Sequence, residues 1–139
     1  MNPLYPILFN LNVFILLTFL HVYWLMGGKT GAELAFHQIA RHIHKPEIPS
    51  KQSLLIRALL LGGIALFSFL QISSFSEILK ADTITWGNRT IAFLFGLRAL
   101  GFFNYVGLTK TYTKGKFAQI DYYIYSPICV ILAICALLA

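Results

Sequence analysis

The sequence predicts an all-α integral membrane protein, a four-helix bundle that forms a single transmembrane domain over residues 1–139. Hydrophobic residues make up 58% of the chain and charged residues 12%, whereas water-soluble domains carry roughly 25% charged residues. The apolar residues also fall into four long blocks separated by three polar stretches, and a spanning helix needs about 20 of them. This composition excludes a globular enzyme, a nucleic-acid-binding module and a disordered tail.

The first two blocks are nearly free of charge. Residues 4–26 contain no charged side chain apart from His21 when it is protonated, and residues 54–72 contain only Arg57, close to their start. Both blocks are long enough to cross a hydrocarbon core of about 30 Å as helices with a rise of 1.5 Å per residue. We therefore expect each of them to form one membrane span.

The third and fourth blocks are less regular. Residues 86–106 carry Arg89 near one end and Arg98 inside, and residues 120–139 contain Pro127. A helix that began only at this proline would measure about 20 Å, too short for the bilayer core. We therefore expect the last helix to begin upstream, near residues 119–121, with a kink or break around residues 125–127.

The distribution of cations predicts the orientation. The two loops at residues 27–53 and 107–119 contain seven of the eleven Lys and Arg residues, whereas the loop between the second and third spans offers Lys80, with Arg89 just inside the next span. Basic loops stay in the cytoplasm, so both termini are expected on the extracytoplasmic side. The formal charge of +6 is then mostly a signal of topology.

A short interfacial helix is expected in the first cytoplasmic loop, over Gly31–Ile43. Its apolar stripe consists of Phe36, Ile39, Ala40 and Ile43, with basic residues opposite, a pattern typical of helices that lie in the membrane surface. Three histidines in and beside this segment, with Glu33, resemble metal ligands only loosely: His37, His42 and His44. The interfacial helix explains the segment better, so we expect no metal.

Four ionisable residues lie within or at the border of the spans in the predicted cytoplasmic half: His21, Arg57, Arg98 and Asp121. Such residues are costly in a membrane and indicate functional sites. Helical spacing places aromatic residues on the same faces, and if these faces converge they form a pocket with a net charge of at least +1. The predicted ligand-binding residues are His21, Trp24, Arg57, Arg98, Tyr105, Asp121 and Tyr125.

The charge of this pocket narrows the ligand. The planar guanidinium fork of an arginine suits a carboxylate or phosphate, so an anionic lipid headgroup or an acidic small molecule is expected. A structural interpretation stands beside this one. Arg57 would then reach the headgroups, Arg98 would pair with Asp121, His21 would hydrogen-bond across helices, and the aromatic residues would form an interfacial belt.

Several motifs follow one another along the chain: HVYWLMGG at residues 21–28, LRALG at 97–101, YVG at 105–107 and YSPIC at 125–129. Together they resemble a bacterial family of small four-span membrane proteins catalogued as a domain of unknown function. The resemblance implies the fold and a multi-pass location in the bacterial inner membrane, and it implies no reaction. Family members usually carry an acidic residue directly after the RAxG motif, where this chain has Phe102, which leaves Asp121 as the nearby partner of the arginine.

The sequence leaves three functions open. The first is binding of the anionic headgroup or acidic molecule. The second is a membrane-embedded enzyme for an amphiphilic substrate, with His21 or Asp121 as general base and Arg98 stabilising negative charge. The third is a structural or accessory subunit of a membrane complex. We expect no cofactor and no nucleic-acid partner. The expected partners are membrane lipids, above all anionic ones. The sequence also allows the chain to form a homo-oligomer or to be a subunit of a larger membrane complex.

Overall fold

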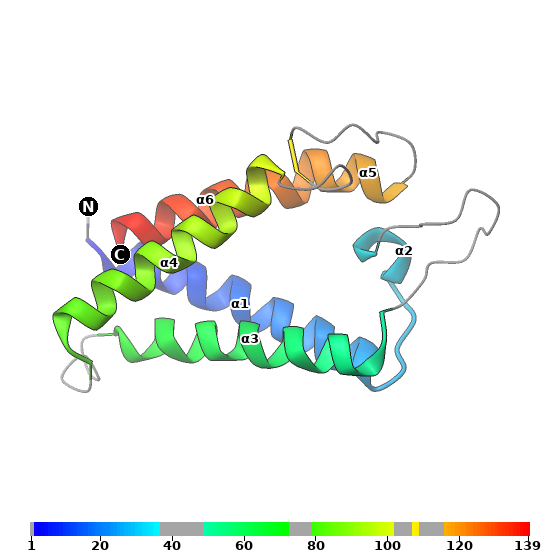
Figure 1. The fold of residues 1–139 in the computed structure, drawn as a ribbon, viewed down its shortest axis with the longest axis horizontal. Helices are drawn as coiled ribbons and strands as arrows, with labels where there is room; N and C mark the ends of the chain where they lie inside the picture. Colours follow the sequence, from blue (N-terminus) through cyan, green and yellow to red (C-terminus); the bar gives the residue numbers. More distant parts are fainter. Residues whose placement is uncertain (1, 37–48, 73–78, 102–106, 109–115) are drawn as a thin grey trace.

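A computed structural model describes residues 2–36, 49–72, 79–101, 107–108 and 116–139 of the chain. All secondary-structure elements of this part are helices, as Figure 1 shows. In chain order they are α1 (Leu4–Leu25), α2 (Ala32–Ala35), α3 (Lys51–Leu70), α4 (Ala81–Leu100), α5 (Lys116–Ile120), the π-helix η2 (Asp121–Tyr125) and α6 (Ser126–Leu138). The predicted all-α class is confirmed.

The long helices form two antiparallel pairs. Helix α1 packs along α3, α4 packs along α6, and α1 also contacts α6, which joins the pairs. Figure 1 shows the pairs close together near the two chain termini and spread apart toward α2 and α5, which contact each other. Both chain termini lie at the same end of the bundle.

Three helical segments of the described chain are long and apolar enough to cross a membrane: α1, α3 and the continuous helix over Ala118–Leu138. Helix α4 is not among them, and it carries Asp82, Arg89 and Arg98 within its 20 residues. It begins five residues before the predicted third span, and residues 102–106 of that span lie outside the described part. Three such helices in so short a chain indicate a membrane protein.

The fourth predicted span begins upstream of Pro127, at Lys116, and passes through a π-helical turn. The irregularity occupies Asp121–Tyr125, slightly earlier than the expected break at residues 125–127, and the Ser126 N–H donates to the carbonyl of Asp121. Proline has no N–H, and its ring crowds the carbonyl one turn back. A wider turn directly before the proline relieves this crowding, so the helix continues without breaking.

The expected interfacial helix is much shorter in the described residues. Helix α2 has four residues, and Phe36 ends it in an extended conformation at φ −118°. Ala32 and Phe36, the residue after the helix, form a buried cluster with Trp24 and Leu54. The rest of the predicted helix and the three histidines His37, His42 and His44 lie outside the described residues.

The main core joins all four long segments. Phe14 and Leu132 are completely buried, and they cluster with Ala65 and Ile91 from the other two segments. The rings of Phe14 and Phe95 lie 5.2 Å apart. This core lies where the helix pairs approach each other, so it holds the bundle together away from the spread end.

Truncation of Leu132 tests this core. Leu132→Ala is expected to lower the free energy of unfolding by about 2 kcal/mol, the lower end of the usual range, because lipid is as apolar as the lost side chain and mainly the cavity counts. Leu137, on the same helix, is 66% exposed, so Leu137→Ala should change stability by less than about 0.5 kcal/mol. Denaturant titration in mixed micelles measures both, and equal losses would contradict the assigned core.

Candidate functional site

An ion pair joins α4 to the fourth span. The Nη2 atom of Arg98 donates to Oδ1 of Asp121 at 2.7 Å, and the backbone N–H of Gly107 donates to Oδ2 at 2.9 Å. The Asp121 side chain is fully buried, whereas the Arg98 side chain is 35% exposed. Both carboxylate oxygens are therefore engaged, and the two charges cancel.

Two glycines allow the chain to reach this carboxylate. Gly101 ends α4 with φ +89°, and Gly107 has φ +94°. A Cβ on Gly107 would overlap the backbone of Gly101, and the Leu108 N–H donates to the Ala99 carbonyl at 2.9 Å. The backbone after residue 106 thus lies directly against the end of α4, and this contact aims the Gly107 N–H at Asp121.

Polar and sulfur-containing side chains of the fourth span accompany the ion pair. Tyr125 is half-buried, Ser126 and Cys129 are buried, and the charges of Arg98 and Asp121 act on both Tyr125 and Cys129. The sequence interpretation included Tyr125 but missed Ser126. Tyr105, which it also included, lies outside the described residues.

His21 lies on the other helix pair. Its Nδ1 is 2.8 Å from the carbonyl of Leu17 in the same helix, so this nitrogen bonds within α1. A carbonyl can only accept, hence Nδ1 carries the proton and Nε2 of the neutral ring is left as an acceptor. The rings of His21 and Trp24 meet edge to face with centroids 5.4 Å apart.

The end of α1 is fixed around Trp24. This side chain is buried, and its indole Nε1 donates to the Thr30 carbonyl at 3.1 Å. A Cβ on Gly28 would overlap the ring of Tyr23, so a glycine at this position lets the loop fold back over the helix end. The HVYWLMGG motif therefore builds a compact turn that carries His21 on its helical side.

Arg57 is an exposed residue of α3, six residues after its first residue Lys51. Its charge acts on the His21 imidazole of the neighbouring helix. Within the described residues the only ion pair is that of Arg98 with Asp121, so Arg57 has no carboxylate partner there. It is therefore an exposed cation without an ion-pair partner in this part of the chain.

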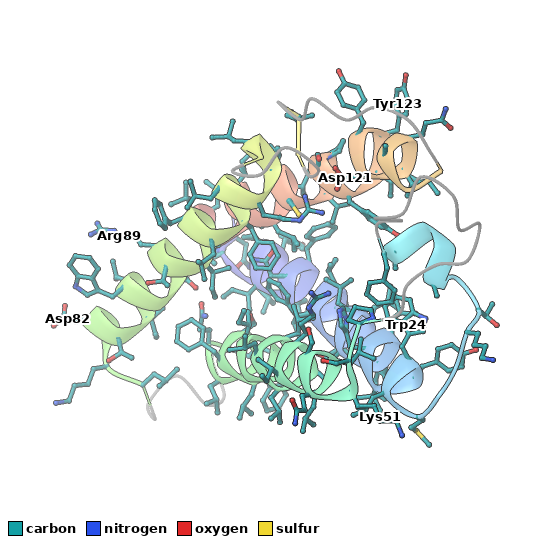
Figure 2. All side chains as sticks on the ribbon, turned by 45° about the vertical axis from the view of Figure 1, so that its right-hand side comes forward. Trp24, Lys51, Asp82, Arg89, Asp121 and Tyr123 are labelled. Carbon is teal, nitrogen blue, oxygen red and sulfur yellow. The ribbon has the colours of Figure 1, made fainter. Side chains whose placement is uncertain are left out.

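The structure thus arranges six of the seven predicted site residues as two groups. His21, Trp24 and Arg57 lie on α1 and α3, and the other three, Arg98, Asp121 and Tyr125, lie on α4 and η2. Figure 2 shows Trp24 between α1 and α2 and Asp121 on the other helix pair. The expected positive charge belongs to the first group, because the second contains its own carboxylate. Among the described residues, no three His, Cys, Asp or Glu side chains gather as a metal site would need.

The fold and these two groups define a small helical membrane protein with an ion pair between a buried carboxylate and a partly exposed arginine. The chain belongs to the family described as Protein of unknown function (DUF3995), whose model matches residues 14–136. The matched range contains both polar groups, and the resemblance to a domain of unknown function is confirmed. No curated protein and no solved structure matches the chain.

Proposed function

We propose that this protein is a multi-pass protein of the bacterial inner membrane that binds an anionic lipid headgroup or an acidic small molecule through Arg57 and His21. One observation carries the proposal. Of the two arginines expected inside the site, Arg98 is neutralised by Asp121, whereas Arg57 is exposed and has no ion-pair partner among the described residues.

The position of Arg57 suits a headgroup. Six residues separate it from the start of α3, which corresponds to about 9 Å along the helix axis. A long arginine side chain covers part of that depth and presents its guanidinium near the interface. The loop before α3 belongs to the predicted cytoplasmic side, where anionic lipids attract basic segments. Carboxylate and phosphate oxygens match the guanidinium fork.

His21 and Trp24 complement this arginine. The His21 ring is anchored through Nδ1, so Nε2 can donate to an anion when the imidazole is protonated. Trp24 packs edge to face against the same ring and holds its orientation. The Arg98–Asp121 pair then serves as a neutral brace between the helices of the second pair, and the excess positive charge remains at Arg57.

Native mass spectrometry of protein extracted from bacterial membranes in a mild detergent tests the proposal. Arg57→Ala is expected to reduce the retained anionic lipid at least about tenfold, equivalent to about 1.4 kcal/mol, and Arg57→Lys should retain more than the alanine variant. Arg89→Ala is the matched control, because Arg89 is an exposed arginine of α4 whose guanidinium lies 5.4 Å from the Trp86 ring centre. Equal retention in Arg57→Ala and Arg89→Ala would overturn the proposal.

The enzymatic alternative is favoured by one detail of His21. Because Nδ1 bonds to Leu17, Nε2 of the neutral ring is an acceptor that could take a proton from an amphiphilic substrate. Asp121 suits this role less, since both of its oxygens already accept hydrogen bonds. An activity on such a substrate whose pH profile is unchanged by His21→Gln would remove this alternative.

A further inference from the structure

Two buried polar atoms near the Arg98–Asp121 pair have no hydrogen-bond partner among the residues that the structure describes. They are Nη1 of Arg98 and Oγ of Ser126. Each is shielded from solvent, and Ser126 is completely buried. Buried donors and acceptors are nearly always paired in native proteins, because an unpaired one has lost its hydrogen bonds to water. Two such atoms near one ion pair indicate a bound group between the helices.

The neighbours of Ser126 on the fourth span place this residue close to Arg98. Arg98 of α4 meets Asp121, whereas further along the fourth span Leu132 clusters with Ile91 of α4. The two helices are antiparallel (Figure 1). The charge of Arg98 acts on Tyr125 and Cys129, which flank Ser126, and Cys129 lies three residues after Ser126 on the same helix face, so Ser126 lies near the end of α4 where Arg98 is located. The backbone N–H of Ser126 donates to the backbone carbonyl of Asp121, so Ser126 follows Asp121 by one turn of the π-helix.

The charge balance determines what can bind there. Arg98 and Asp121 cancel each other, so a buried anion at this place would add an uncompensated charge in a medium of low dielectric. A neutral group adds none. The Arg98 guanidinium can only donate, and a serine hydroxyl can donate or accept. The bound group must therefore offer an oxygen or another neutral acceptor.

We infer that Arg98 Nη1 and Ser126 Oγ together bind one neutral hydrogen-bond acceptor, namely a water molecule or an ester or hydroxyl oxygen of an amphiphile. This site differs from the anion site proposed at Arg57, on the other helix pair, and does not depend on it. Ser126 becomes a ligand-binding residue, although as the residue before Pro127 it looks like a helix cap in the sequence.

The test compares Ser126→Ala with Ser68→Ala in the full-length protein. Ser68 is also buried, but its Oγ donates to the Ile64 carbonyl of its own helix at 3.0 Å. Unfolding midpoints are measured by tryptophan fluorescence in delipidated micelles, alone and with dioleoylglycerol as a neutral ester probe or oleate as an anionic one. Ser126→Cys, of similar size but with a weakly bonding thiol, is expected to follow the alanine variant.

Two outcomes support the inference and name the source of the acceptor. If dioleoylglycerol raises the wild-type midpoint by about 3 °C or more, and Ser126→Ala abolishes this rise while Ser68→Ala keeps it, the acceptor belongs to an amphiphile. If Ser126→Ala instead lowers the midpoint without lipid by more than Ser68→Ala does, and the response to lipid is unchanged, the acceptor is water.

Two other outcomes overturn it. Removal of a hydroxyl that truly lacks a partner relieves its desolvation cost, so an unchanged or raised midpoint of Ser126→Ala, with an intact response to dioleoylglycerol, would show that nothing binds there. A rise in midpoint with oleate that is larger than with dioleoylglycerol, and that Ser126→Ala abolishes, would show an anion site instead of a neutral one.

Discussion

Gly107→Ala is expected to lower the free energy of unfolding by about 2 to 5 kcal/mol. Gly107 has φ +94°, and a Cβ at this position would overlap the backbone of Gly101. The left-handed conformation alone costs a non-glycine residue about 1 to 2 kcal/mol. To relieve the overlap, the backbone at residue 107 must move away, which withdraws its N–H from the Asp121 carboxylate. The buried carboxylate oxygen then loses a hydrogen bond, and this loss costs about 1 to 3 kcal/mol.

Gly63→Ala is the matched control for this variant. Gly63 is a helical residue of α3, and a Cβ at its position meets nothing within 4 Å. Because alanine favours helix over glycine by up to about 1 kcal/mol, this variant should be neutral or slightly stabilised. Denaturant titration of both proteins in mixed micelles measures the difference. Equal stability of the two variants would contradict the close contact of Gly107 with the end of α4.

Most of the fold follows from hydrophobic pattern alone. The apolar blocks at residues 4–26 and 54–72 correspond closely to α1 and α3, because a long uncharged block admits few structures other than a spanning helix. Helix α4 shows the limit of this reasoning. It contains Asp82, Arg89 and Arg98 in 20 residues, and its place in the bundle depends on packing against α6 and on the Asp121 carboxylate, which no local pattern encodes.

The sequence predicts which polar residues lie within the spans better than it predicts how these residues are arranged. The sequence singled out Arg98 and Asp121 but left open whether the arginine pairs with the carboxylate or receives a ligand. The choice depends on how closely α4 approaches η2, and this approach is set by Gly107 and by the π-turn before Pro127. The tertiary contacts of a glycine or of a π-helical turn cannot be predicted from a local sequence pattern.

Ser126 and Gly107 were not predicted as site residues, although each has a recognisable local pattern in the sequence. Ser126 precedes a proline, where an N-cap is common, but the length of the span already predicts a helix that begins upstream. The helix does pass through Ser126, and the serine is completely buried. Gly107 follows Tyr105 and Val106 at the end of an apolar block, where a glycine is expected for loop geometry alone. In both cases the burial of the residue depends on segments far away in the sequence, which no local pattern encodes.

Arg98→Leu and Asp121→Leu are each expected to lower the free energy of unfolding by about 3 kcal/mol, and the double variant is expected to recover most of this loss. Removal of one partner leaves the other charge unpaired, which typically costs 3–5 kcal/mol for a buried pair. The lower value applies here because the Arg98 side chain is 35% exposed and the Gly107 N–H still bonds to Asp121 in Arg98→Leu. Replacement of both charges by apolar groups is often tolerated.

A double-mutant cycle measured by denaturant titration checks this expectation, with Arg89→Leu as the control for loss of an exposed arginine on α4, expected within about 0.5 kcal/mol of the wild type. Additive losses from the two single variants would show that the charges are not coupled. The double variant also separates the functions. If it is stable and retains anionic lipid, the pair is a brace and Arg57 holds the ligand. If it is stable and retains none, Arg98 belongs to the binding site, because its loss removed the ligand without unfolding the bundle.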